Sequence, residues 1–272
     1  MVMEYISVKE ASERWGISER RVRALCESGR IEGVTRCGDW VWSIPATTQR
    51  PADGRTLRYI KNRSLRTGSQ DYREVDSLKK TSRQNVLTSA QKNEIACEIL
   101  AFDGINVTSD QVRDVSRLIK QEFDLKTHLQ ILNIDGAFSM GVSELSETSL
   151  KQVNERLLCN IRTKGGVYAV SGTQAQEVEA MLSQYAGPWS VLHPVARAAF
   201  LFSELMRICP FEEANTATAF WFLENELLRA KFPPVLFGSE NMSQVKAALA
   251  STRIRGNSQG LIDLIKSSME GK

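Results

Sequence analysis

Histidine and paired cysteines are scarce in this chain. Its 272 residues include two histidines, His128 and His193, and five cysteines, at positions 26, 37, 97, 159 and 209. No two cysteines form a CxxC pair, whereas a structural zinc site needs about four Cys or His ligands at characteristic spacings. The composition therefore predicts no metal site of this kind, and the scattered cysteines favour free thiols in a reducing cytoplasm.

Long apolar runs are absent as well. No stretch approaches the ~18 apolar residues that a membrane helix needs. The first residues, MVMEYISVKEA, are charged from position 4 and contain no apolar signal-peptide core. We therefore expect a cytoplasmic protein without membrane contact. Apolar residues make up 42% of the chain and charged residues 25%, which is ordinary globular usage.

Charge is unevenly distributed along the sequence. Residues 1–66 contain 13 Lys and Arg against 8 Asp and Glu, whereas residues 67–272 contain 22 against 24. A basic segment ahead of a slightly acidic body favours contact between that segment and a polyanion.

Two short helices are predicted near the start of the chain. Ser7 and Glu10 form a capping box at the beginning of the first, which covers residues 8–15. Ser18 is the predicted N-cap of the second, which covers residues 19–27. The short turn between them predicts a compact helix pair.

A hairpin follows the helix pair. Strand signals at residues 34–36 and 40–44 flank a Cys-Gly-Asp turn. The stretch ISVKEASERWGISERRVRALCESGRIEGV, with WVWSIP after it, resembles the excisionase/MerR-like winged helix-turn-helix family. The resemblance implies a small domain over residues 1–50 whose second helix enters the major groove of double-stranded DNA.

Five residues are the candidate DNA contacts. They lie near the start of the second helix or on the hairpin wing: Ser18, Arg20, Arg21, Arg23 and Arg36. Arginines at such positions bind guanine edges or phosphates. One module makes few contacts, so we expect a homodimer on a specific site. The alternative is that these arginines are merely solvated and the module docks on protein.

Residues 51–90 are predicted to be a linker. They have weak periodicity and turn signals, and they contain a basic cluster between positions 55 and 66. One short helix is expected around residues 72–80.

Residues 91–272 carry mostly helical spacing. Val112, Val115 and Ile119 form one predicted apolar stripe, and residues 219–223 are apolar on every side, as in the centre of a bundle. Residues 167–170, beside several glycines, give the one strand signal and predict a small hairpin flap. The expected fold is therefore mainly α: the small winged domain plus a helical bundle with a β-hairpin flap.

The second half resembles the core of the Fic (Fido-fold) family. The matching stretch, residues 193–237, is HPVARAAFLFSELMRICPFEEANTATAFWFLENELLRAKFPPVLF, and the family motif is H-P-F-x-[D/E]-G-N-G-R. Other matches are LKTHLQILN, LSETSLKQVNERLL, GVYAVSG at the target-docking flap and AFDGINVT where many members keep an inhibitory helix. The resemblance spans residues 91–270, and Fic proteins with an N-terminal DNA-binding module are a known bacterial arrangement.

The motif departs from the family pattern at its chemical positions. The family's histidine is the general base that activates a target hydroxyl for attack on the α-phosphate of ATP, and Cys209 stands in its place. A thiol needs a lowered pKa to act as a base near neutral pH. Ala214 and Thr216 replace the motif glycines, and Ala217 replaces the phosphate-binding arginine. Loss of such a charge-assisted contact removes about 2–5 kcal/mol.

Three further positions match the family's functional residues. Glu213 occupies the acidic, metal-side position and Asn215 keeps the motif asparagine. They are the candidate nucleotide ligands, although loop capping is the alternative role. Asp103 occupies the position of the regulatory glutamate, but the arginine that this glutamate pairs with in the family is replaced by Phe220 or Trp221.

These observations leave three interpretations. The first is a DNA-binding regulator or scaffold with an inactive Fic domain, which needs no cofactor and has a protein partner at the flap. The second is an active AMP transferase that uses ATP and Mg²⁺. The third is an interaction module that does not bind DNA. His193 lies about 24 Å upstream of Cys209 in a helix and cannot replace the base; we expect it to start a helix, and His128 to be a core residue.

Overall fold

The computed structural model describes residues 5–28, 31, 33–37, 41–48, 50, 65, 67–68, 71–79, 86–119, 121–169 and 173–270. The predicted turn at 38–39, the basic cluster between 55 and 66, and flap residues 170–172 lie outside the described residues. No helix within these ranges has both the length and the apolar character needed to span a membrane.

The two predicted N-terminal helices are confirmed as α1 (Val8–Trp15) and α2 (Glu19–Glu27). At the start of α1, the Glu10 amide donates to Ser7 Oγ at 3.2 Å, and the Ser7 amide donates to Glu10 Oε2 at 2.8 Å. Ser18 caps α2 by accepting a hydrogen bond from the Arg21 amide at 3.3 Å. Local capping groups thus set where both helices begin.

An antiparallel sheet completes this N-terminal unit. It consists of β1 (Tyr5–Ile6), β2 (Thr35–Cys37) and β3 (Val41–Pro45), in the order β1-β3-β2. Arg36 pairs with Trp42 in the hairpin of β2 and β3. The unit has its own hydrophobic cluster, and the buried members include Ala11, Trp15, Val22, Leu25 and Ile44.

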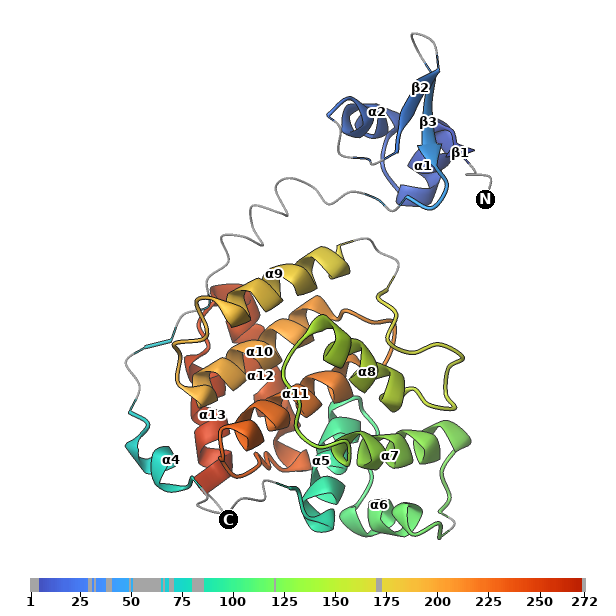
Figure 1. Ribbon diagram of the computed structural model, residues 1–272. Helices are drawn as coiled ribbons and strands as arrows, with labels where there is room; N and C mark the ends of the chain where they lie inside the picture. Colours follow the sequence, from blue (N-terminus) through green and yellow to red (C-terminus); the bar gives the residue numbers. More distant parts are fainter. Residues whose placement is uncertain are drawn as a thin grey trace.

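The rest of the chain is a helical body (Figure 1). Its elements are α4 (Arg73–Ser77), α5 (Ser89–Phe102), α6 (Ser109–Ser116), α7 (Leu125–Phe138), α8 (Glu147–Leu157), α9 (Gln174–Ala186), α10 (Pro194–Ile208), α11 (Asn215–Arg229), η1 (Ser239–Asn241), α12 (Met242–Arg255) and α13 (Gln259–Glu270). Helices α10 and α11 pack side by side at its centre. The mainly α architecture is as expected.

Helix α11 is buried on every side, as its apolar segment predicted. Phe220, Trp221 and Phe222 are at most 3% exposed. Its buried polar residues are compensated: Glu226 accepts from Arg197 Nε at 2.5 Å, and Asn225 pairs with the backbone of Ser143. Such pairing offsets the desolvation cost of burying polar groups.

Helix α4 lies inside the predicted linker and packs on the body. Val75 is fully buried in the hydrophobic core of the body. Tyr72 stacks on His193 with ring centroids 3.8 Å apart, and His193 Nε2 lies 3.1 Å from Asp76 Oδ1. His193 is the N-cap of α10, which confirms its expected place at a helix start.

One local expectation needs correction. Helix α6 ends at Ser116 because Leu118 adopts a left-handed conformation (φ 61°), so Ile119 leaves the predicted apolar stripe and is half exposed. At the flap, Tyr168 forms an isolated antiparallel bridge with Phe211. The rest of the predicted hairpin, residues 170–172, lies outside the described residues.

Candidate functional site

The loop between α10 and α11 contains the motif residues and turns at two left-handed positions. Cys209 has φ 46° and Ala214 has φ 60°. The second is a position where the Fic motif has glycine, the residue that adopts this conformation without strain. The backbone therefore retains a shape suited to glycine although the side chain is alanine.

Asn215 closes this loop on itself. Its Oδ1 accepts from the Phe211 amide at 2.9 Å, and its Nδ2 donates to the Phe211 carbonyl at 2.7 Å. The oxygen and the nitrogen of the Asn215 side-chain amide therefore both have a partner in the loop. Bonds of this kind are those of a loop-capping side chain.

Glu213 is held by two cations. Lys126 Nζ donates to Oε2 at 2.9 Å and Arg162 Nε donates to Oε1 at 2.6 Å. Hydrogen bonds from Lys126 and then Arg162 lower the pKa of Glu213 below its ordinary value. The carboxylate is thus ionised at neutral pH, with both oxygens engaged.

Asn154, which the sequence did not single out, joins the flap to the loop. It is fully buried in α8; its Oδ1 accepts from the Gly166 amide at 2.9 Å and its Nδ2 donates to the Glu213 carbonyl at 3.0 Å. A Cβ on Gly166 would lie 2.7 Å from the Lys151 carbonyl oxygen, so the flap can approach α8 closely only with glycine there.

The flap also pairs directly with the motif loop. The Ala169 amide donates to the Pro210 carbonyl at 2.9 Å, and the rings of Tyr168 and Phe211 lie 5.4 Å apart. Beside this contact is a cavity of about 260 Å³, whose lining includes Arg162, Lys164 and Tyr168.

The first turn of α11 is in contact with Asp103. The Thr216 hydroxyl donates to Asp103 Oδ1 at 2.6 Å. Burial raises the pKa of Asp103, whereas Thr216 and Lys246 act in the opposite direction. Ala217 is 6% exposed and its methyl group offers no hydrogen bond. The structure thus brings Asp103 to the predicted phosphate end of α11, where its partner is a hydroxyl group rather than an arginine.

Cys209 is exposed and ends α10. Its Sγ lies 3.3 Å from the Met206 carbonyl oxygen. Partial burial of the sulfur raises the pKa of the Cys209 thiol, while the charges of Arg253 and Arg207 lower it. The thiol is therefore protonated at neutral pH, which is the wrong state for a general base.

The candidate DNA contacts lie on the exposed side of the N-terminal unit. Arg20, Arg21 and Arg23 are exposed, and the buried residues of α2 are Val22, Leu25 and Cys26. Arg23 makes an ion pair with Glu19 at 2.7 Å. Arg36 is exposed on β2, and its guanidinium lies 5.1 Å from the centre of the Trp42 ring.

Other predicted residues are placed as follows. Ser18 is engaged in capping α2. His128 is half-buried, with Nδ1 3.0 Å from the Asp124 carbonyl oxygen. Within the described ranges, no three His, Cys, Asp or Glu side chains gather as metal ligands do.

Solved structures share the arrangement of this chain, although no family model and no curated protein matches its sequence. A fragment of Fic-1 from C. elegans superposes with a TM-score of 0.60 at 17% identity, covering 79% of this chain and 68% of that one. A Fic family protein from Desulfovibrio desulfuricans gives 0.59 at 13% identity, covering 66% of this chain and 64% of that one.

A third structure agrees with these two. A Fic domain containing signaling protein from Bacteroides thetaiotaomicron gives a TM-score of 0.57 at 18% identity, covering 65% of this chain and 82% of that one. At such identities the likeness establishes the fold and leaves activity open. The helical body of this chain has the Fic fold.

Proposed function

We propose that this chain is a DNA-binding regulator or scaffold whose Fic-fold body does not transfer nucleotides. The observation that carries the proposal is the exposed row of arginines on α2, opposite the buried side of that helix. Winged helix-turn-helix modules insert their second helix in the major groove, and the residues in its first turns contact the DNA.

The wing supports the same proposal. Arg36 is held over the Trp42 ring, which restricts its side chain before DNA is bound and lowers the entropy cost of the contact. In this scheme, Arg20 and Arg21 contact bases or phosphates in the major groove and Arg36 contacts the adjacent backbone. One unit offers few contacts, so we propose that two copies bind together.

The motif loop supports the absence of transfer chemistry. The base position carries a thiol with a raised pKa, and the position of the phosphate-binding arginine carries a methyl group. Glu213, the acidic residue for a metal, already has two cations on its carboxylate. These residues do not fit an ATP–Mg²⁺ complex, because its phosphates lack their cation and its metal would have to displace Lys126 and Arg162.

A body without this chemistry can serve as a docking scaffold. Its flap is fixed to the loop by a backbone hydrogen bond and to α8 by the bond from the Gly166 amide to the Asn154 side chain. The cavity of about 260 Å³ lies beside it. We place the protein partner there, as a segment that pairs with the flap.

Gel retardation of duplex DNA tests the DNA-binding half of the proposal. Affinity of the full chain should fall steeply with salt, because each phosphate contact contributes about 0.9 to the slope of log K against log salt. The double variant Arg20→Ala/Arg21→Ala should bind at least tenfold more weakly. The matched control, Arg113→Ala/Arg117→Ala in the body, should bind like the parent. Equal retardation of all three proteins would contradict the proposal.

A further inference from the structure

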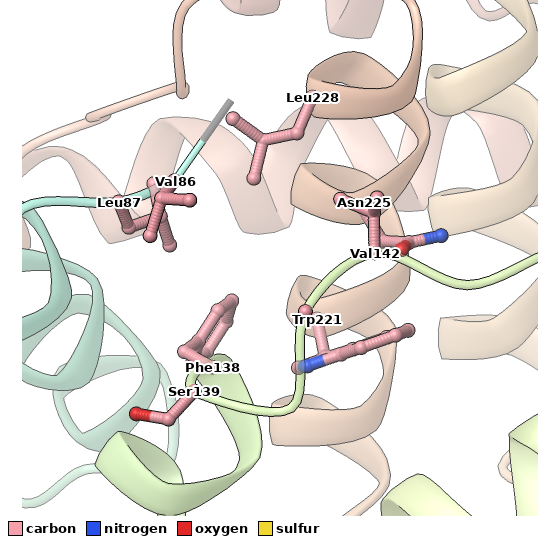
Figure 2. Close-up of a pocket in the computed structure, with 9 residues that line it drawn as sticks. Val86, Leu87, Phe138, Ser139, Val142, Trp221, Asn225 and Leu228 are labelled. Carbon is pink, nitrogen blue, oxygen red and sulfur yellow. The ribbon is translucent and has the colours of Figure 1, made fainter. Parts of the chain in front are cut away.

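A second cavity lies on α11, away from the motif loop. It has a volume of about 150 Å³, and Figure 2 shows its walls: Val86 and Leu87 before α5, Phe138 at the end of α7, and Trp221 and Leu228 on α11. Trp221 is six residues beyond Asn215, which is about 9 Å along the helix. The residues of this cavity therefore do not belong to the candidate site described above.

The polar side chains in its walls are already satisfied. Trp221 Nε1 donates to the Ala137 carbonyl at 2.9 Å. Asn225 uses both ends of its amide, since Oδ1 accepts from the Ser143 amide and Nδ2 donates to the Ser143 carbonyl, each at 2.8 Å. Ser139 Oγ donates to the Asp135 carbonyl at 2.8 Å and accepts from Lys92 at 2.7 Å. Each of these side chains thus has protein partners for its polar atoms.

The walls of the cavity are mostly apolar. Two aromatic and several aliphatic side chains make its walls, and Val86 and Val142 at its edge are 72% and 50% exposed. An apolar pocket of about 150 Å³ has room for a molecule of the size of benzene. A partner helix is much too large for it, because a helix with its side chains is about 10 Å wide.

We propose that this cavity binds a small apolar molecule the size of one aromatic ring. Because the walls are mostly apolar and their polar side chains have protein partners, selection is by size and apolarity, and a ligand with hydrogen-bonding groups would lose hydration with little compensation. The site is independent of the proposed DNA binding, so either proposal can fail alone.

Thermal unfolding of the full chain in the presence of benzene tests this proposal. Occupancy of the folded state alone raises Tm with ligand concentration. Benzene should raise the Tm of the parent and quench Trp221 fluorescence in a saturable way, with the saturable part lost in Trp221→Phe. Glycerol, a polar molecule of similar size, should show no saturable effect.

Two variants separate cavity binding from general partitioning. Val86→Asp places a charge at the exposed edge without disturbing the core and should weaken benzene binding at least tenfold. Val142→Phe, which fills the space, should do the same. Val191→Asp is the matched control, because Val191 is 86% exposed and does not line the cavity. No saturable effect in the parent, or equal effects in all variants, would overturn the proposal.

Discussion

At position 214 the backbone has a left-handed conformation and the residue is alanine. A Cβ in this conformation lies too close to the following carbonyl, which costs about 1–2 kcal/mol relative to glycine. The position therefore carries strain that the glycine of the Fic motif avoids.

Replacing Ala214 with glycine should increase the free energy of unfolding by about 0.5–1 kcal/mol, because relief of the strain exceeds the added entropy of the unfolded chain. Chemical denaturation measures this. The control is Ala230→Gly, since Ala230 has φ −84° and should lose stability instead. Equal losses in both variants would contradict the strain argument.

Glu224 is a buried carboxyl group that the site does not use. Burial raises the pKa of Glu224 well above its ordinary value of 4.5, the nearby Glu98 raises it further, and the Val235 amide lowers it. The folded chain thus binds this proton more tightly than the unfolded chain does. Stability from this group is complete below pH 4.5 and is lost as pH rises through the folded pKa.

Glu224→Gln should therefore gain stability relative to the parent between pH 5 and pH 8. A relative gain of about 1 kcal/mol corresponds to about 2–4 °C in Tm for a unit of this size. Tm measured at both pH values tests this, with the exposed Glu122→Gln as the control. A Tm difference that is the same at pH 5 and pH 8 would show that the folded chain binds the Glu224 proton no more tightly than the unfolded chain does.

At the scale of elements, α4 packs on the body although the sequence assigned residues 51–90 to a linker. His193 is one of its contacts with the body, since it stacks on Tyr72 and lies beside Asp76. Burial lowers the pKa of His193 below 6.5, although Asp76 acts in the opposite direction. The unfolded state therefore takes up the proton more readily, and stability falls as pH drops below 6.5.

Hydrogen exchange in residues 71–79 should consequently become faster when pH is lowered from 7.5 to 5.5, after correction for intrinsic rates. His193→Asn keeps a helix-capping group but cannot titrate, so its protection should not depend on pH in this window. Protection that changes equally in both proteins would rule out His193 as the titrating group.

The elements were predictable where their signals are local. Ser7 and Glu10 are three residues apart, so the start of α1 could be read from the sequence. The contact of Thr216 with Asp103 joins residues 113 positions apart, and that of Asn154 with Glu213 joins residues 59 apart. Only folding brings such groups together. Asp103 was therefore predicted through the family resemblance alone, and Asn154 was not predicted.

At the scale of the whole molecule, the helical body has the Fic fold, while Cys209 and Ala217 stand at two chemical positions of the motif. The central helix pair, the loop and the flap lie together, and Asn215 binds the backbone of its own loop. The claim on which this account rests is that the fold persists without its transfer reaction.

Calorimetric titration of ATP with Mg²⁺ into the full chain tests this claim most directly. We predict no saturable heat at millimolar nucleotide, because the phosphate cation is missing and Glu213 is already neutralised by Lys126 and Arg162. Saturable binding of ATP that weakens at least tenfold in Asn215→Ala or Glu213→Gln would contradict the account.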